Sequence, residues 1–136
     1  MNCIRYQHGY KYQLYETYQH RLINPIKVDK HVSTHFLDLS TDGILTIKQG
    51  YASDGPSGIS VDSPSFMRGA FIHDALYQLM REGFIDRSQK DAADKELHDV
   101  CIQDGMLRVR AWWVYKAVQR FGRSSTINNR QVIIAP

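Results

Sequence analysis

The hydrophobic pattern of this 136-residue chain changes its period once, across a glycine-rich segment that begins at Gly50. Before that segment apolar and polar residues alternate, as over 10–14 and 44–47, and such alternation indicates strands with one buried face. After it, apolar residues recur every three or four positions, which indicates helices. Strands followed by helices are typical of α+β proteins. We therefore expect a single α+β domain over 1–136, with a small N-terminal antiparallel β-sheet followed by a core of three helices.

Further strands are expected within the first fifty residues. Alternation predicts them at 26–29 and over the continuous run 32–39, and Asp42-Gly43 is typical of a hairpin turn. The expected domain then has four parts. They are a β-rich part (1–50), a glycine-rich loop (51–62), a helical part (63–122) and a polar tail (123–136).

Capping residues mark the ends of the expected helices. Ser63, followed by a proline, is an N-cap with proline in the first turn. Ser88 opens the second helix with Asp91 in the position of a capping-box acid, and Gly105 ends it. The three expected helices span 64–81, 88–104 and 107–122.

Composition excludes several classes of protein. Cys3 and Cys101 lie far apart and match no metal-ligand spacing, which argues against a zinc ribbon or a disulfide-rich secreted scaffold. No segment has the roughly eighteen uninterrupted apolar residues of a membrane span, and 1–18 lacks the apolar core of a signal peptide. We expect cytoplasmic synthesis without an export signal. The net charge of +3 is compatible with an anionic membrane or a phosphate ligand but indicates neither.

Titratable residues gather in the middle of the most buried expected helix. His73 and Asp74 are adjacent, so their side chains point about 100° apart and have different partners. Taken alone, this pair favours a structural role with both groups satisfied by the backbone. An antiparallel second helix, however, can bring Asp94 opposite His73 and fix the imidazole tautomer. Tyr77, one turn beyond His73, can donate its hydroxyl to the same carboxylate.

The glycine-rich loop carries an acid directly before a glycine. Asp54 and Asp74 could both supply oxygens to a hard cation, with loop carbonyls such as that of Gly55 completing the shell. The alternative is that 54–56 is an ordinary turn, as such sequences usually are. A helix that carries Asp74 beside His73 favours the cation site.

These residues resemble the bacterial and fungal branch of the secreted phospholipase A2 family. The resemblance covers 53–122, about half of the chain. It depends on the order and spacing of several motifs together. They are Ser53-Asp54-Gly55-x-Ser57, His73-Asp74-x-x-Tyr77, Arg87 leading to Asp94, and Tyr115-x-Ala117-Val118-x-x-Phe121-Gly122.

The resemblance implies a phospholipase A2-like helical core and calcium-dependent hydrolysis of a phospholipid or a related carboxylic ester. In that family the loop acid, loop carbonyls and the aspartate after the catalytic histidine bind calcium, which stabilises the oxyanion and holds the phosphate. The histidine, oriented by a second aspartate, deprotonates the water that attacks the sn-2 ester. The implied residues are Asp54, Gly55 and Asp74 for the metal, and His73, Asp94 and Tyr77 for catalysis.

The whole chain also resembles a family of unknown function that is common in tailed phages and prophages. The matching segments are 50–58, 66–69 and 110–113, and this second resemblance is the closer one. It leaves open a non-enzymatic phage structural or host-interaction protein on the same scaffold, and an association with the virion. The chain departs from the secreted phospholipases in lacking their disulfides and in carrying Pro56 inside the loop.

The expected partner is a phospholipid membrane surface or a small ester substrate. A lipid hydrolase that acts on a membrane also needs a surface that contacts the bilayer. Trp112, Trp113 and the neighbouring arginines are the candidates for an interface with a phospholipid membrane. Nucleic acid is not an expected partner, because the charge excess is small and the arginines are spread around the helix. A host or phage protein remains an alternative partner.

A second enzyme class, the His-Asp metal phosphohydrolases, would need a further ligand such as His31 or His35. Both lie in expected strands, whereas that fold is a longer, all-helical bundle. The other histidines have no partner at ligand spacing, and we interpret them as surface residues. They are His8, His20 and His98.

Overall fold

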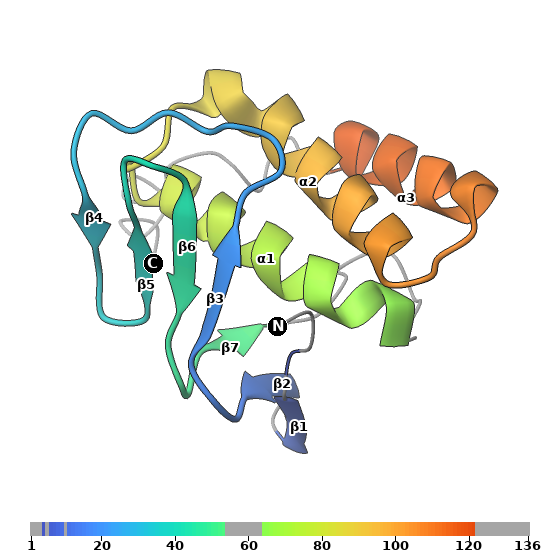
Figure 1. Cartoon of the computed structure of the whole chain (residues 1–136), viewed down its shortest axis with the longest axis horizontal. Coiled ribbons are helices and arrows are strands. Elements are labelled where there is room, and N and C mark those ends of the chain that lie inside the picture. Colours follow the sequence, from blue (N-terminus) through green and yellow to red (C-terminus); the bar gives the residue numbers. More distant parts are fainter. Residues whose placement is uncertain (1–3, 5, 10, 54–63, 122–136) are drawn as a thin grey trace, which may run out of the picture.

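The computed structural model describes residues 4, 6–9, 11–53 and 64–121. Over these ranges, antiparallel strands precede three α-helices, which confirms the expected α+β class (Figure 1). The strands are β1 (Tyr6–Gly9), β2 (Lys11–Leu14), β3 (Tyr18–Arg21), β4 (Val32–Ser33), β5 (Leu37–Leu39), β6 (Ile44–Ile47) and β7 (Ala52–Ser53). The helices are α1 (Pro64–Arg81), the 3-10 turn η1 (Arg87–Gln89), α2 (Lys90–Gln103) and α3 (Arg108–Phe121).

The larger sheet has four strands in the order β3-β6-β5-β4, and every neighbouring pair is antiparallel. The chain turns between β5 and β6 at Asp42-Gly43, as predicted. Gly43 has a φ of +91°, a conformation that favours glycine. The alternation of β6 places Leu45 and Ile47 on the inner face, where both are 0% exposed.

A second, smaller sheet in the order β1-β2-β7 divides what we expected to be one sheet. Its strand β7 lies inside the segment predicted as loop. Leu14, at the end of β2, also binds the two residues that precede β7. The Leu14 amide donates to the carbonyl of Tyr51 at 2.8 Å, and the Leu14 carbonyl accepts from the amide of Gly50 at 2.9 Å. The backbone that leads out of the sheets towards α1 is therefore held in place as far as Ser53.

Two of the expected strands are wrong. Residues 26–29 form no strand, although the apolar Ile26 is buried as the alternation suggests. The run 32–39 is not continuous, because it folds back into β4 and β5 through a turn in which the Thr34 amide donates to the Leu37 carbonyl at 2.7 Å. A period of two fits one long strand and a tight hairpin equally well.

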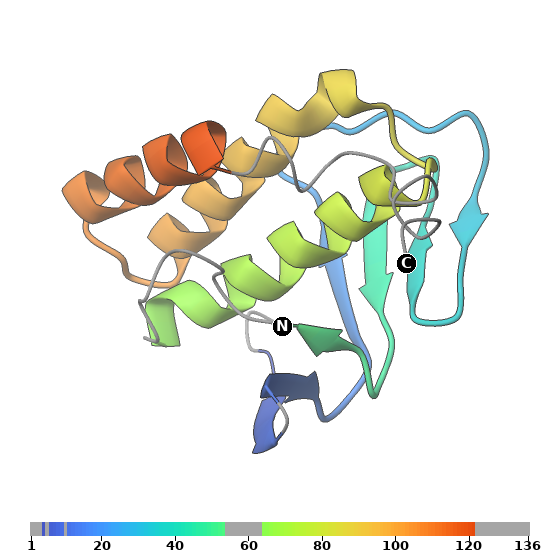
Figure 2. The same ribbon diagram turned by 180° about the vertical axis from the view of Figure 1, so that it is seen from behind.

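Helix α1 is the centre of the fold and is buried on almost all sides. It lies across the larger sheet (Figure 2), where Phe71 and Leu76 join Leu39 and Leu45 in one hydrophobic core. Its other side packs against α2. No helix within the described ranges combines the length and the hydropathy needed to cross a lipid bilayer.

Helices α1 and α2 run antiparallel and approach closely at Gly69. A Cβ at this position would lie 2.9 Å from the Leu97 Cδ1 and 3.1 Å from the Cys101 Sγ. At the same end of the pair, the buried Arg68 guanidinium Nε donates to the Asp104 carboxylate at 2.9 Å. The close approach and the ion pair together fix how far the two helices slide along one another.

The ends of the helices agree only in part with prediction. Ser88 does not cap α2, because Asp86 caps the preceding η1 and its carboxylate accepts from the Ser88 amide. Gly105 follows the end of α2 as expected, with a φ of +98°. Helix α3 packs on α2 through a cluster that includes Val114. The expected caps Ser63 and Gly122 and the tail 123–136 lie outside the described residues.

Candidate active site

The antiparallel packing of α1 and α2 brings His73 against Asp94. The His73 Nε2 lies 2.8 Å from the Asp94 Oδ1. Asp94 is 0% exposed and His73 is 6% exposed, so water hardly screens the pair. A histidine ring oriented by a buried carboxylate is the arrangement that general-base catalysis uses.

Two further donors hold the same carboxylate. The Tyr77 hydroxyl donates to the Asp94 Oδ1 at 2.5 Å, and the Lys90 ammonium donates to the Oδ2 at 2.6 Å. Lys90 also donates to the backbone carbonyls of Val118 and Gln119, and these contacts join the first turn of α2 to the last turn of α3. Sequence reasoning included Tyr77 and missed Lys90, although Lys90 and Asp94 stand four residues apart on one helix, a spacing typical of ion pairs.

These donors keep Asp94 ionised. Burial alone would raise the pKa of its carboxyl, but the hydrogen bonds from His73, Lys90 and Tyr77 outweigh burial and hold the pKa below its ordinary value. Burial and the neighbouring Asp94 raise the pKa of the Tyr77 phenol, so Tyr77 stays a donor. An ionised carboxylate only accepts hydrogen bonds, which assigns the hydrogen of the contact to the His73 Nε2.

The other ring nitrogen of His73 is then the basic one. In the neutral imidazole one nitrogen carries the hydrogen and the other carries a lone pair, which here falls to Nδ1. Within the part of the chain that the structure describes, Nδ1 has no hydrogen-bond partner. The Tyr77 ring lies 4.0 Å from the His73 ring, centroid to centroid, and limits how the imidazole can rotate.

Asp74 has a partner of its own and lies next to the end of β7. The Ser53 hydroxyl donates to the Asp74 Oδ2, and the Asp74 side chain is half-buried. The other two expected metal ligands, Asp54 and Gly55, lie outside the described residues. Among the residues that are described, no three histidine, cysteine or acidic side chains come together as a metal site.

A hollow of about 400 Å³ borders the α2–α3 side of the carboxylate. Its lining residues are Lys90, Asp91, Asp94 and Gln119. The Gln119 amide and the Tyr115 hydroxyl both donate to Asp91, at 2.8 Å and 2.6 Å. The hollow is therefore polar and closely hydrogen-bonded, and Asp94 forms part of its wall.

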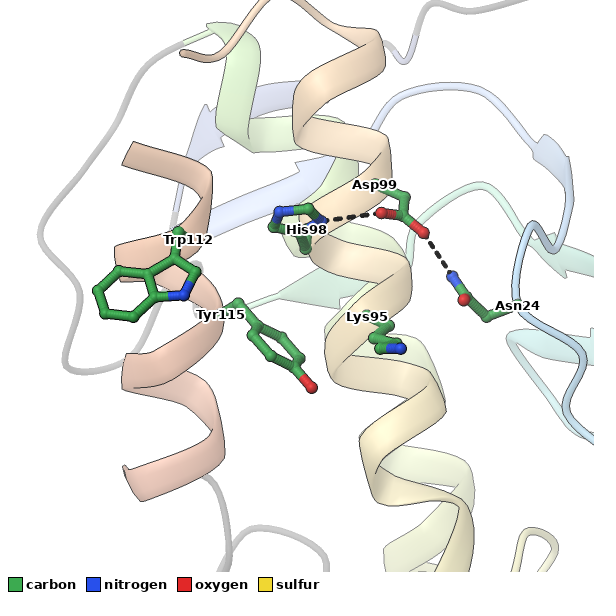
Figure 3. A pocket seen from close by; sticks show the side chains of 6 residues that line it. All are labelled: Asn24, Lys95, His98, Asp99, Trp112 and Tyr115. Carbon is green, nitrogen blue, oxygen red and sulfur yellow. Dashed lines mark hydrogen bonds and ion pairs between the residues drawn. The ribbon is translucent and has the colours of Figure 1, made fainter. Parts of the chain in front are cut away.

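A groove of about 300 Å³ is lined by residues of α2, α3 and the segment after β3 (Figure 3). His98 and Asp99 of α2 both line it, and the His98 Nδ1 lies 2.8 Å from the Asp99 Oδ1. Asn24 donates to the second oxygen of Asp99 at 2.9 Å, and Trp112 stands at the opposite rim. This histidine is half-buried, unlike the surface residue that we expected, and it belongs to a group separate from His73.

The prediction that His20 is a surface residue is wrong. His20 is 6% exposed, and its Nε2 lies 2.6 Å from the Oε2 of Glu96, which is fully buried. Glu96 also accepts from the backbone amides of Ile23 and Asn24, at 2.9 Å and 2.7 Å. The alternation of β3 carried the signal, because His20 shares the inner face of that strand with the buried Tyr18.

The ligands of the phosphohydrolase alternative do not assemble. His31 and His35 are exposed, and His31 is close enough to the β4–β5 hairpin to act on the charge of Asp38. Neither joins His73 and Asp74 in a metal site among the described residues. Trp112 and Trp113, the expected interface residues, are 49% and 64% exposed on α3.

No family model, curated protein or solved structure matches this chain. The two family resemblances therefore stay predictions from motifs. The geometry itself provides a buried histidine–carboxylate pair, a second aspartate at the exit of β7, and an exposed aromatic surface on α3.

Proposed function

We propose that this chain is a hydrolase of phospholipid or related carboxylic esters, with His73 as its general base. One observation carries the proposal: Asp94 holds the Nε2 of His73, which leaves Nδ1 as the basic nitrogen. Packing alone does not require a fully buried carboxylate that three side chains hold in its ionised form. Burying a charged carboxylate costs free energy, and such groups are found at functional sites, where they orient a catalytic base.

In the proposed reaction, Nδ1 of His73 takes a proton from a water molecule as the water oxygen attacks the ester carbonyl carbon. The imidazolium that forms faces the ionised Asp94, which stabilises it. The tetrahedral intermediate then collapses, the bond to the alcohol oxygen breaks, and the imidazolium returns its proton to that oxygen. The products are a fatty acid and a lysophospholipid, and His73 is neutral again.

Tyr77 and Lys90 act in this scheme as positioning residues. Both donate to Asp94, so they fix the direction of the carboxylate before substrate arrives. The Lys90 charge also compensates the carboxylate while His73 is neutral. Such fixed groups need no rearrangement when charge develops, and this is the usual source of a large electrostatic contribution.

Calcium is the proposed cofactor, and Asp74 would hold it. Carboxylate and hydroxyl oxygens are the donors that calcium prefers, and Asp74 and Ser53 bring such oxygens together where the chain enters 54–63. Asp54 and the carbonyl of Gly55 would complete the set. When bound, calcium would supply positive charge for the developing oxyanion and the phosphate.

The test is fatty-acid release from mixed anionic liposomes, with calcium and with a chelator. We expect release that depends on calcium and falls at least about a thousandfold in His73→Gln. His31→Gln and His35→Gln are matched controls, because they change exposed histidines that only the phosphohydrolase alternative would use. No release by the unaltered chain, with all variants folded alike, would favour the non-enzymatic phage protein.

A further inference from the structure

Helix α3 has an outer face opposite to its buried one. Its buried residues, Ala111, Val114 and Val118, pack towards α1 and α2. The residues opposite to them recur every three or four positions, so they form one stripe along the outside of the helix. That stripe contains Val109, Trp113, Lys116 and Arg120, all exposed.

Large apolar side chains gather at the first turns of this outer face. Seven large hydrophobic residues are exposed in the described part of the chain, and four of them fall within 107–113. The Trp112 and Trp113 rings lie 5.1 Å apart in an edge-to-face contact, and the Lys116 ammonium lies 5.6 Å from the Trp112 ring. Exposed apolar residues that gather in one short segment indicate an interaction surface, whereas scattered single ones do not. We call Leu107, Val109, Trp112, Trp113, Lys116 and Arg120 the α3 face.

Positive charge is concentrated on the same helix. Helix α3 carries four basic residues and no acidic one, and all four are exposed. With these set aside, the remaining 13 Lys and Arg are outnumbered by 14 Asp and Glu. The small net positive charge of the whole chain is therefore due to the basic residues of α3. The four residues are Arg108, Arg110, Lys116 and Arg120.

We propose that the α3 face binds the surface of an anionic lipid bilayer. Tryptophan prefers the boundary between headgroups and acyl chains, and long basic side chains reach the charged headgroups while their stems stay in apolar surroundings. Single-stranded nucleic acid also stacks on tryptophan beside basic residues. Stacked bases would not bury the aliphatic side chains of Leu107 and Val109, which are 77% and 73% exposed. A bilayer buries all four apolar residues and neutralises the charge.

Since the α3 face would bring the proposed hydrolase to its substrate, the inference rests on the proposed function. The active site and the face belong to one packed unit, because Lys90 binds both Asp94 and the last turns of α3. Binding to a bilayer and hydrolysis are nevertheless separate events, which two different measurements can follow.

The fluorescence of the chain reports on this face alone, because its only two tryptophans are Trp112 and Trp113. The full-length His73→Gln chain is titrated with vesicles of phosphatidylglycerol and phosphatidylcholine in equal parts, and with vesicles of phosphatidylcholine. We expect a blue shift with the anionic vesicles that weakens as salt rises. The double variant Lys116→Glu/Arg120→Glu should bind at least about twentyfold more weakly. The control Lys27→Glu/Lys30→Glu makes the same change in net charge at exposed residues between β3 and β4, and its binding should stay within about threefold.

Hydrolysis of a monomeric short-chain phospholipid by the unaltered chain is measured in parallel. A blue shift that the Lys116→Glu/Arg120→Glu variant loses supports the inference even if nothing is hydrolysed, and then only the proposed function fails. Hydrolysis without a blue shift overturns the inference and leaves the function standing. An equal loss of binding in the control variant overturns it, as does a shift with single-stranded oligonucleotide but not with vesicles.

Discussion

Asp94 and Glu96 lie two residues apart on α2, and each accepts a hydrogen bond from the Nε2 of a histidine on a different element. Residues two apart on a helix point about 200° from one another, so the carboxylates face opposite sides of α2. Asp94 faces His73 on α1, and Glu96 faces His20 on β3. The two contacts together fix the rotation of α2 about its axis, and that rotation decides whether Asp94 meets His73.

This relationship predicts that Glu96 matters for stability more than its distance from the proposed chemistry suggests. In Glu96→Gln the backbone amides of Ile23 and Asn24 lose one of the two equivalent oxygens of a fully buried side chain. We expect the free energy of unfolding to fall by about 3 kcal/mol. Urea denaturation measures it, with Glu82→Gln as a control at a partly exposed glutamate. A loss below about 1 kcal/mol would show that Glu96 does not hold α2.

A second prediction concerns pH and Asp94. Its pKa is lowered from 3.8 in the folded chain, so the ionised carboxylate stabilises the fold above about pH 4 and this contribution disappears as the pH falls through the lower, folded pKa. We expect Asp94→Asn to be less stable than the unaltered chain at pH 7, and we expect this difference in the free energy of unfolding to narrow as the pH falls below about 4. Urea denaturation across this range measures the difference. A difference that stays constant down to pH 3 would contradict the lowered pKa.

A third prediction tests the close approach of the helices. Alanine favours helices over glycine by about 1 kcal/mol, so Gly69→Ala should stabilise an isolated α1. In the folded chain the added Cβ meets Leu97 and Cys101 at distances shorter than ordinary contacts. We expect a net loss of about 1–3 kcal/mol in the free energy of unfolding. Gly83→Ala is the control, because it has open space around it and tests only the strain of its positive φ. A more stable Gly69→Ala chain would show that the helices can separate without cost.

The contact between His73 and Asp94 was predictable from the sequence, because two consecutive helices with a short connection pack antiparallel and the register then follows from their lengths. The β5–β6 hairpin was predictable from Asp42-Gly43. The turn at 34–36 was not, since the alternation continues through it. Local patterns describe neighbours along the chain, and they show little about partners that only the tertiary fold brings together.

The pairing of His20 with Glu96 is such a case, because 76 positions separate the two residues. The inner-face position of His20 could be read from β3, but its partner could not. Lys90 is different, since its spacing from Asp94 was visible and only its burial was not. The calcium part of the expected site depends on Asp54 and Gly55, which lie outside the described residues, and it stays a prediction.

The most direct measurement compares the rate of fatty-acid release by the unaltered chain and by Asp94→Asn, with a monomeric short-chain phospholipid and saturating calcium at pH 7. An asparagine can turn its carbonyl or its amide towards Nε2, and the amide would move the imidazole hydrogen to Nδ1 and remove the base. We expect the rate to fall by about 10³–10⁴-fold while the circular dichroism spectrum stays that of the unaltered chain. A folded Asp94→Asn chain that hydrolyses the ester within about threefold of the unaltered rate, or an unaltered chain that releases no fatty acid, would contradict the assignment of His73 as the base.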